Sequence, residues 1–161
     1  LNQKESLSFL TFAPSYVDYL LTCLKHSRPT TLSKIVGVYH IQYRHSLTGE
    51  NFKRDILVLE NLFYPPYKSS STIIYDLKGS MRNRLVTQDD SVLLDENFIN
   101  SSQENPLYVR LHSKWLLMKA LYSDTLFLSK HGIVDYSLLL YYNTEELNVH
   151  VGIIGMENTK K

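Results

Sequence analysis

The stretch "TIIYDLKGSMRNR", residues 72–84, changes character halfway along. Its first half is apolar and β-branched, as in a buried strand, and its second half is rich in polar residues and glycine: Asp76, Lys78, Gly79, Ser80, Arg82 and Arg84. On an extended chain Lys78, Arg82 and Arg84 are evenly spaced and can share a face. Cations on one face bind phosphate through charge-assisted hydrogen bonds. The stretch therefore indicates a phosphate site. The alternative is a β-turn with solvated cations, one of them paired with Asp76.

The composition is that of one globular domain, or of a large piece of one. The 161 residues are 43% hydrophobic and 20% charged, and the net charge of +1 argues against a nucleic-acid partner. The single cysteine, Cys23, cannot form an intrachain disulfide and fits a reducing, cytosolic setting. No run approaches the roughly 20 apolar residues that span a bilayer, so we expect no transmembrane segment. The chain begins with Leu1 and not with Met, which indicates a fragment.

The residues before this stretch predict a helix and a hairpin. Apolar residues recur at helical spacing over 8–26, with Pro14 suited to the first turn of the helix. β-branched and aromatic runs over 34–45 and 55–63 predict two strands of an antiparallel hairpin. The Pro/Ser-rich segment 64–71 is the clearest internal linker.

The residues from 72 onward predict a strand, two helices and a second hairpin. A strand covers 72–79, and a short helix lies around 93–99. The helix over 108–130 is apolar on most sides, so we expect it to be buried. Strands over 132–142 and 147–154, with a short turn between them, form the second hairpin. The order of helices and strands indicates an α+β fold and not a regular βαβ alternation.

Asp135, in "HGIVDYSLLL" (131–140), is the candidate catalytic acid. A buried carboxylate costs several kcal/mol unless it is paired or takes part in chemistry. An acid at the lip of a hairpin can accept a proton from a substrate hydroxyl. The alternative is an Asp that caps a turn between helix and strand. We interpret His131 as an ordinary helix-end residue.

The strand end "LVLENLF" (57–63) can present backbone N–H and C=O groups to a purine edge. Many strands end in this way, so the pattern is weak by itself. The six histidines show no spacing typical of metal ligands, and neither a G-x-G-x-x-G nor a G-K-[ST] loop is present.

The motifs, taken in order, resemble the phosphatidylinositol phosphate kinases. They are "ENLF", "YDLKGSMRNR", "LLDEN", "NPLYVRLHSK", "VDYSLLL" and "VGII". "SFLTFAPSYVDYL" and "PTTLSKIVGVY", with "NPLYVRLHSK", favour the type III branch, the FYVE-finger phosphatidylinositol 3-phosphate 5-kinases of endosomes and vacuoles. The resemblance covers residues 8 to 154. It implies a cytoplasmic enzyme, peripheral on endosomal or vacuolar membranes, that can work with scaffold proteins.

The resemblance implies a partial catalytic domain of antiparallel sheet and packed helices. Residues 1–63 would be the remainder of the N-lobe and the hinge, and 64–71 the linker. Residues 72–161 would hold the DLKGS-type strand, the buried helix and the catalytic hairpin. The phosphate-binding hairpin of the N-lobe and the activation segment would be missing.

The resemblance also gives individual residues a role in ATP-dependent phosphorylation of the inositol 5-hydroxyl. Asp135 would orient and deprotonate that hydroxyl, and Lys78 would act with it. Lys78, Arg82 and Arg84 would face the phosphates of nucleotide and headgroup, with Mg²⁺ bridging the nucleotide phosphates. The adenine would be held through backbone groups of the hinge residues Leu59, Glu60, Asn61 and Leu62.

Gly155 departs from the family pattern, which places a metal-binding Asp there. A glycine has no side chain with which to ligate Mg²⁺, so we assign no metal ligand. With the ATP-binding lysine and the activation segment also missing, we expect the isolated chain to be nearly inactive. The alternative function is an inactive phosphoinositide-binding scaffold or relic.

Overall fold

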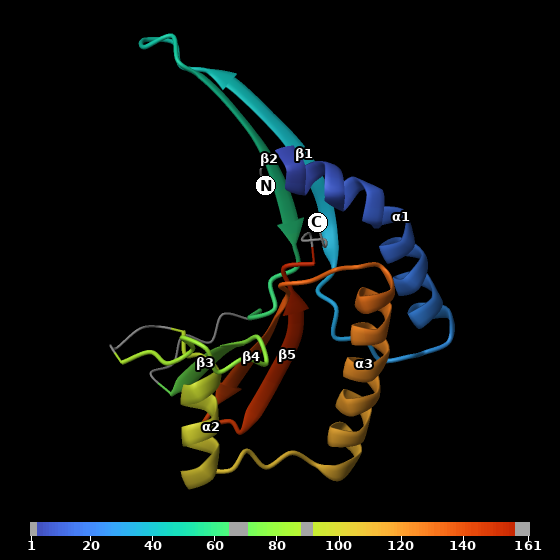
Figure 1. Cartoon of the computed structure of the whole chain (residues 1–161), viewed down its shortest axis with the longest axis vertical. Helices are drawn as coiled ribbons and strands as arrows, with labels where there is room; N and C mark the ends of the chain where they lie inside the picture. Colours follow the sequence, from blue (N-terminus) through green and yellow to red (C-terminus); the bar gives the residue numbers. More distant parts are fainter. Residues whose placement is uncertain (1–2, 65–70, 88–91, 157–161) are drawn as a thin grey trace.

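The computed structural model of the chain describes residues 3–64, 71–87 and 92–156. Figure 1 shows the helices and strands of these residues, which are, in chain order, α1 (Gln3–Lys25), β1 (Ile35–Arg44), β2 (Asn51–Leu59), β3 (Thr72–Leu77), α2 (Asp95–Glu104), α3 (Leu111–Lys130), β4 (Ser137–Asn143) and β5 (Asn148–Ile154). The strands form two antiparallel sheets, and the predicted α+β class is confirmed. The predicted linker falls mostly on residues 65–70, outside the described residues, and the division of the chain at 64–71 stays a prediction.

β1 and β2 form the first predicted hairpin, which projects from the rest of the molecule as a long ribbon (Figure 1). Its β-branched and aromatic side chains favour extended backbone, and Tyr43 stacks on Phe52 across the strands with ring centroids 5.0 Å apart. The second strand covers 51–59 and not the predicted 55–63. The predicted hinge residues 60–62 therefore follow the strand directly.

β3, β4 and β5 form the second sheet, with β4 in its centre. Leu138 pairs with Leu77 on one side and with Ile153 on the other. Because side chains alternate along a strand, these three share a face, and they line one apolar cleft together with side chains of α2 and α3. The opposite face carries Leu139 and its partner Gly152. The sheet therefore has one face toward the two helices and one face left for the hinge.

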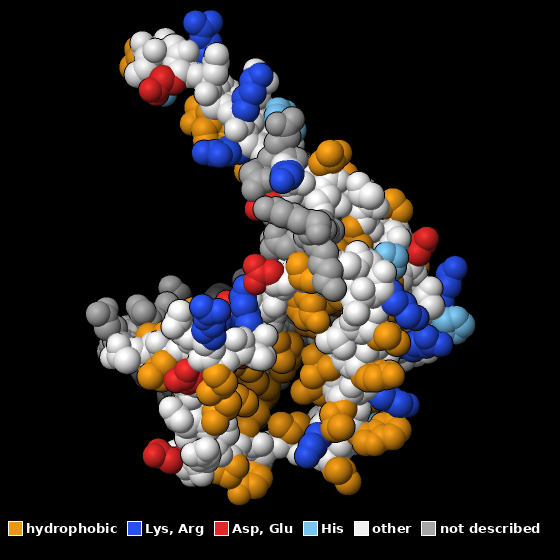
Figure 2. Space-filling view, in the orientation of Figure 1, with side chains coloured by type: hydrophobic (Ala, Val, Ile, Leu, Met, Phe, Trp, Pro, Cys, Tyr) orange, Lys and Arg blue, Asp and Glu red, His pale blue; other side chains and the backbone are white. Residues whose placement is uncertain are grey.

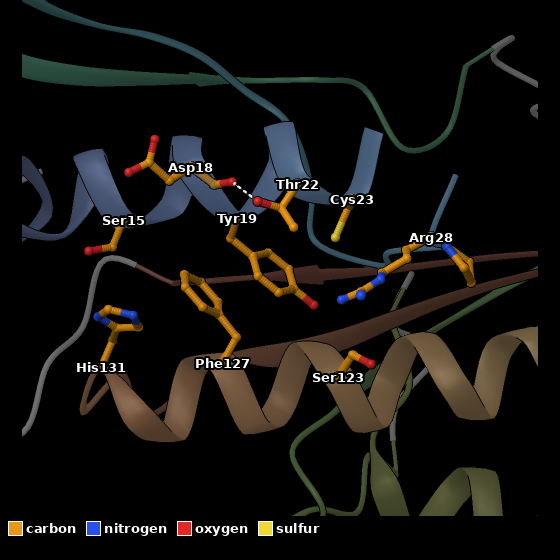
Figure 3. Close-up of a pocket in the computed structure, with 10 residues that line it drawn as sticks. Ser15, Asp18, Tyr19, Thr22, Cys23, Arg28, Ser123, Phe127 and His131 are labelled. Carbon is orange, nitrogen blue, oxygen red and sulfur yellow. Dashed lines mark hydrogen bonds between the residues drawn. The ribbon is translucent and has the colours of Figure 1, made fainter. Parts of the chain in front are cut away.

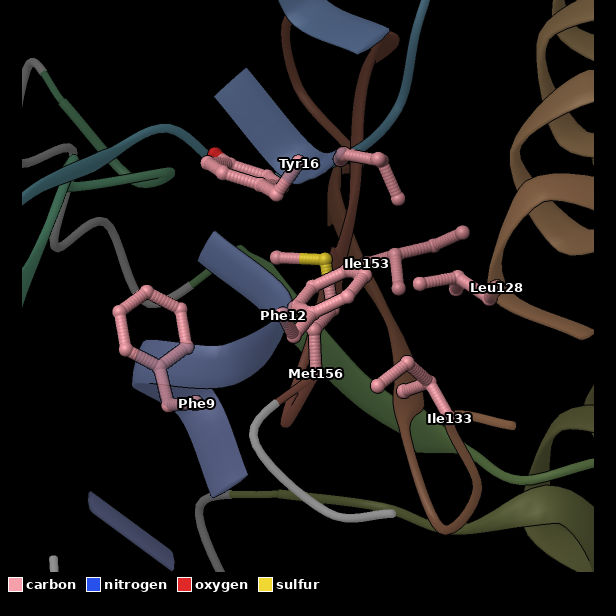
Figure 4. Close-up of a cluster of buried hydrophobic side chains, with 8 residues drawn as sticks. Phe9, Phe12, Tyr16, Leu128, Ile133, Ile153 and Met156 are labelled. Atoms are coloured by element: carbon pink, nitrogen blue, oxygen red, sulfur yellow. The ribbon is translucent and has the colours of Figure 1, made fainter. Parts of the chain in front are cut away.

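The hydrophobic core lies where α1, α3 and β5 meet (Figure 4). Its buried members are Phe9, Phe12, Tyr16, Leu32, Leu128, Ile133, Ile153 and Met156. The Tyr16 hydroxyl donates a hydrogen bond of 2.7 Å to the carbonyl of Ser33 and accepts one of 3.0 Å from the N–H of Ile35. The core therefore also fixes the segment between α1 and β1.

α1 differs from its prediction in two respects. It begins at Gln3, so Pro14 lies inside the helix and not in its first turn. A proline there removes one backbone hydrogen bond, and the burial of Phe9 and Phe12 on the preceding turns offsets that loss. By length and composition alone, Lys4–Lys25 is also apolar enough to cross a membrane. Its buried aromatic face is that of an amphipathic core helix.

α3 is far more exposed than predicted. Only Ala120, Asp124 and Leu128 are buried, and they recur every four residues along one face. Trp115 is 58% exposed and Tyr122 is 72% exposed, and Figure 2 shows apolar side chains along this part of the surface. An apolar pattern on all sides of a helix does not tell which sides other elements cover. Among the described residues, other elements cover only one side of α3. The prediction that this helix is buried on most sides is therefore wrong.

Candidate active site

The cationic segment after β3 is a loop and not an extended chain. The backbone turns through left-handed conformations at Gly79 (φ +69°) and Asn83 (φ +57°), which glycine and asparagine adopt more readily than other residues. Lys78, Arg82 and Arg84 nevertheless line one cleft of about 610 Å³. The structure brings the three cations together through turns, and not through the alternation of a strand.

Asp95, the first residue of α2, holds this loop in shape. Its buried carboxylate accepts hydrogen bonds from the N–H of Lys78 (3.0 Å), the N–H of Gly79 (2.8 Å) and Nε of Arg84 (2.8 Å). Burial by itself would raise the pKa of Asp95, but the bonds from Arg84 and the two N–H groups outweigh burial, and the net pKa is lowered. Sequence reasoning did not assign Asp95. The Asp of "LLDEN", placed where a helix begins, was the available signal.

Arg84 is committed to two carboxylates. Its Nη2 donates to the Asp76 carboxylate at 2.9 Å and to the Asp76 carbonyl at 2.5 Å, while Nε binds Asp95. The pairing of Asp76 with one cation, which formed part of the alternative, is therefore present, but Arg84 is mostly buried and not a solvated cation. Two anions balance the Arg84 charge, so less of its field reaches the cleft than the field of exposed Arg82.

Asn97 fixes the far end of the same loop to α2. Its Oδ1 accepts hydrogen bonds from the N–H of Val86 (3.0 Å) and the N–H of Leu94 (3.2 Å), and its Nδ2 donates to the Val86 carbonyl (2.9 Å). Together, Asp95 and Asn97 place both ends of the cationic loop on one short helix.

Asp135 lies across the cleft from the cationic loop, with its carboxylate 2.5 Å from Nζ of Lys78. Its side chain is 66% exposed, because β4 begins only at Ser137 and Asp135 belongs to the loop before it. The predicted burial within the strand is therefore wrong, while the predicted place at the lip of the hairpin is confirmed. The backbone of Asp135 is left-handed (φ +62°), a strained state that recurs at functional sites.

Gly155 lies beside Asp135 at the end of β5. A Cβ built on Gly155 would contact the Asp135 carbonyl at 3.6 Å and the Cα of Tyr136 at 3.5 Å, which are ordinary van der Waals distances. The backbone there is also left-handed (φ +78°), a conformation that Asp tolerates better than most residues. The position therefore has room for a short carboxylate next to the candidate acid, at the cost of a strained left-handed backbone.

The predicted hinge begins where β2 ends. The N–H of Glu60 donates to the Lys34 carbonyl at 2.8 Å, and the Glu60 carboxylate accepts from the N–H of Lys34 at 2.8 Å and from its Nζ at 3.0 Å. The Asn61 side chain accepts from the N–H of Phe63 at 3.0 Å. Leu59 is the last residue of the strand. Glu60 therefore ties the hinge to the start of β1, and its N–H is already used within the chain.

Leu62 and Phe63 pack on the second sheet, on the face away from the helices. A Cβ on Gly152 would come within 2.6 Å of Leu62, so only glycine leaves room for that side chain. The ring of Phe63 lies 5.5 Å from that of Tyr141. Leu139 pairs with Gly152 and so shares this face. Sequence reasoning missed Leu139, although its alternation with the other leucines of β4 could have indicated it.

A metal ion finds few ligands in this site. Within residues 3–64, 71–87 and 92–156, no three His, Cys, Asp or Glu side chains lie close enough together to hold one. Asp135 is paired with Lys78, and Gly155 has no side chain. The described residues by themselves do not fit a protein-held metal.

A second cavity of about 360 Å³ opens between α1 and α3 (Figure 3). Tyr19 stacks on Phe127 with ring centroids 4.2 Å apart, and Arg28 lies at the edge. His131 also lines it, and its N–H caps α3 through the Phe127 and Leu128 carbonyls, as a helix-end residue should. Sequence reasoning assigned nothing to this cavity, which shares no lining residue with the cationic cleft.

Comparison with known proteins places the chain among lipid kinases in sequence. The family model described as phosphatidylinositol-4-phosphate 5-kinase matches residues 1–161. The chain is 46% identical to the 1-phosphatidylinositol 3-phosphate 5-kinase of Homo sapiens over 96% of its own length and 8% of that protein. It is 42% identical to 1-phosphatidylinositol 3-phosphate 5-kinase FAB1 of Saccharomyces cerevisiae over 99% of its length and 7% of that protein. FAB1A of Arabidopsis thaliana is 38% identical over 96% of the chain and 9% of the relative. The chain thus spans less than a tenth of these relatives.

Proposed function

We propose a function from the premise that the chain belongs to the phosphatidylinositol-4-phosphate 5-kinase family. The protein that carries these residues transfers the γ-phosphoryl group of ATP to the inositol 5-hydroxyl of phosphatidylinositol 3-phosphate. The observation that carries the proposal is the pair of Lys78 and Asp135, 2.5 Å apart on the wall of a cationic cleft. The names of the similar proteins support the choice of lipid and of hydroxyl.

Asp135 is the group that we assign to the substrate hydroxyl. Because its carboxylate is exposed, a headgroup reaches it without any rearrangement of the core. Asp135 accepts the hydroxyl proton as the 5-oxygen bonds to the γ-phosphorus and the bond from that phosphorus to the leaving ADP oxygen breaks. The proton then passes from Asp135 to water, which returns the carboxylate for the next cycle.

The cations of the cleft stabilise charge on the transferred group. Lys78 Nζ leaves Asp135 for the phosphate oxygens when nucleotide binds, which frees the carboxylate for the hydroxyl. Arg82, exposed on the same wall, binds the phosphate of the headgroup. Arg84 adds positive potential and, through Asp76 and Asp95, keeps the loop in shape.

The hinge and the free face of the second sheet hold the nucleotide base. Residues 59–62, with Glu60 fixed by Lys34, offer their remaining backbone groups to the purine edge. Leu139 and Ile154 share the sheet face on which Leu62 packs, and an apolar floor of this kind suits a flat base.

Mg²⁺ belongs to the proposal as the ion that accompanies ATP. When bound, it neutralises phosphate charge. Because the described residues do not fit a protein-held metal, the roles above belong to side chains alone. Gly155, at the place of the expected acid, is one of the reasons that we expect the 161-residue chain to be nearly inactive.

We also propose that the protein containing these residues works in the cytoplasm, peripherally on endosomal or vacuolar membranes, and with scaffold proteins. The support is the likeness to the type III branch. An inactive scaffold or relic is not favoured, because the similar proteins are named as kinases.

The test restores the missing carboxylate. The chain and its Gly155→Asp variant are incubated with radiolabelled ATP, Mg²⁺ and vesicles of phosphatidylinositol 3-phosphate, and the phosphorylated lipid is identified by its headgroup. We expect a trace of product from the chain and at least about tenfold more from Gly155→Asp, because Mg²⁺ uses one or two carboxylates beside the substrate phosphates. Asp135→Asn in that background removes the gain, and Lys114→Ala on α3 serves as the control.

Binding decides the case in which no variant forms product. The chain should sediment with vesicles of phosphatidylinositol 3-phosphate more than with vesicles of phosphatidylinositol, and Lys78→Ala or Arg82→Ala should remove that preference. Equal binding to both vesicles, phosphate at another hydroxyl, or product that survives Asp135→Asn contradicts the proposal.

A further inference from the structure

Asp124 is a fully buried carboxylate in the middle of α3. One of its oxygens accepts hydrogen bonds from the Tyr19 hydroxyl (2.7 Å) and the Thr30 hydroxyl (2.9 Å). The other accepts from the N–H (2.6 Å) and the hydroxyl (2.7 Å) of Thr31. None of the ion pairs among the described residues includes Asp124. All four of its donors are neutral.

The donors come from the two segments that precede the first hairpin. Tyr19 belongs to α1, and Thr30 and Thr31 belong to the connection between α1 and β1. A carboxylate only accepts hydrogen bonds, so it can serve four donors, whereas an amide of the same shape would place its own N–H groups against some of them. Asp124 therefore fixes the position of this connection on α3 by charge and geometry together.

The connection leads to the hinge within a few residues. The Thr31 carbonyl accepts from the N–H of Ile153 at 2.7 Å, and the N–H of Ser33 donates to the Ile153 carbonyl at 3.0 Å, which joins the connection to β5. Lys34 follows and holds Glu60 of the hinge through three contacts. A series of hydrogen-bonded residues thus leads from Asp124 to the hinge, the segment assigned to the nucleotide base.

The helix of Asp124 leads to the catalytic loop. α3 continues from Asp124 to Lys130, and the Leu128 carbonyl accepts from the N–H of Ile133 at 3.0 Å. Asp135 follows two residues later. Leu128 and Ile133 are also core residues beside Ile153, so the loop has little freedom relative to the helix.

We propose that Asp124 is a positioning residue that sets the hinge at 59–62 relative to the loop of Asp135. Asp124 lies where α3, which leads to the loop of Asp135, contacts the connection between α1 and β1, which leads to the hinge. The meaning of these two segments for catalysis rests on the proposed function, but their relative position does not. Tyr16, which bonds Ser33 and Ile35, acts on the same connection from the α1 side.

The test measures that relative position directly. Spin labels at Asn61→Cys and Lys130→Cys, in a Cys23→Ser background, report the distance between the hinge and the end of α3 by pulsed electron resonance. We expect one narrow distance distribution for the labelled chain and a broader or shifted one for Asp124→Asn. Phe98→Leu, a substitution in α2 beside Tyr75 that removes none of these hydrogen bonds, controls for loss of stability and should leave the distribution narrow.

Single-donor variants keep the test decisive where Asp124→Asn does not fold. Tyr19→Phe and Thr30→Val each remove one of the four bonds, and each should broaden the distribution less than Asp124→Asn. The proposal is overturned when these variants, or Asp124→Asn, leave the distribution as narrow as Phe98→Leu does.

Nucleotide binding separates this proposal from the proposed function. ATP titrated into the chain should bind at least about tenfold more weakly after Asp124→Asn, because small misplacements of binding groups carry large costs, and Phe98→Leu should bind as the chain does. A chain that binds no ATP contradicts the proposed function, while the spin-label distances still decide the role of Asp124. Equal ATP affinity of chain and Asp124→Asn overturns the positioning role.

Discussion

The two buried carboxylates Asp95 and Asp124 each have their oxygens occupied by hydrogen bonds, but from different partners. Asp95, at the start of a helix, accepts from the guanidinium of Arg84 and from the backbone N–H groups of Lys78 and Gly79. Asp124 faces hydroxyls and one N–H in the middle of a helix. A helix N-terminus and a cation both favour an anion, and mid-helix hydroxyls do so only by hydrogen bonding. Asp95 therefore shapes the cationic loop, and Asp124 fixes how the connection between α1 and β1 joins α3.

The largest effect on stability is expected for Asp95→Ala. It leaves Nε of Arg84 and two N–H groups without their acceptor, with Asp76 as the one remaining partner of the Arg84 charge, and breaking a buried pair typically costs about 3–5 kcal/mol. Urea unfolding measures this loss. Asp18→Ala, on the exposed side of α1, should stay within about 0.5 kcal/mol of the chain. Similar losses for the two variants would show that Asp95 is not the anchor of the loop.

Asp124→Ala should cost less, about 2 kcal/mol by the same measurement. No cation is left behind, and water can reach the Tyr19 and Thr30 hydroxyls, so the penalty comes mainly from the buried groups of Thr31. A loss larger than that of Asp95→Ala would reverse the comparison and mean that neutral donors hold a buried acid more strongly than a guanidinium does.

The dependence of stability on pH should separate Asp95 from its amide. The folded pKa of Asp95 is lower than its ordinary value of 3.8. A lowered pKa contributes stability that is fully present above the unfolded pKa and is lost as the pH falls through the folded pKa. The difference in free energy of unfolding between the chain and Asp95→Asn should therefore be constant above about pH 5 and shrink on acidification below 3.8. A difference that does not change with pH contradicts the charged state of Asp95.

The smallest effect is expected for Asp135→Asn. The pair with Lys78 is exposed, and such pairs contribute little, while asparagine tolerates the left-handed backbone. The free energy of unfolding should change by less than about 0.5 kcal/mol. In the Gly155→Asp background, the same Asp135→Asn substitution should nevertheless abolish the kinase activity. Asp135→Ala should cost about 1 kcal/mol more, because alanine does not share this tolerance. Equal stability of the two variants would argue against backbone strain at Asp135.

The sequence alone predicted what depends on local pattern. Both hairpins follow from β-branched and aromatic runs bounded by turns, and Lys78, Arg82 and Asp135 were assigned before their shared cleft was known. Partners distant in sequence could not be predicted. The acceptor for the N–H groups of Lys78 and Gly79 is Asp95, on another element, and no spacing rule connects them.

The predictions that the structure contradicts failed for a common reason, which is tertiary packing. The apolar pattern of α3 predicted burial on most sides, but only the side with Ala120 and Leu128 meets other elements. The local pattern predicts Pro14 in a first turn. The helix instead extends back to residue 3, because Phe9 and Phe12 are buried in the core, and that burial is not a local property of the sequence. The exposure of Asp135 depends on where β4 begins, and strand ends are set by the pairing partner.

The cleft owes its outline to backbone handedness at Gly79, Asn83, Gly132 and Asp135, all of which have positive φ and line the cleft or lie next to residues that do. Only one of these residues is assigned to the reaction. Over evolutionary time a β-branched residue at any of the other three would disturb the cleft while leaving every catalytic side chain in the sequence. Under the proposed function, a member of this family can therefore lose its activity without any substitution at Lys78, Arg82 or Asp135, and a comparison of those three residues alone would not reveal the loss.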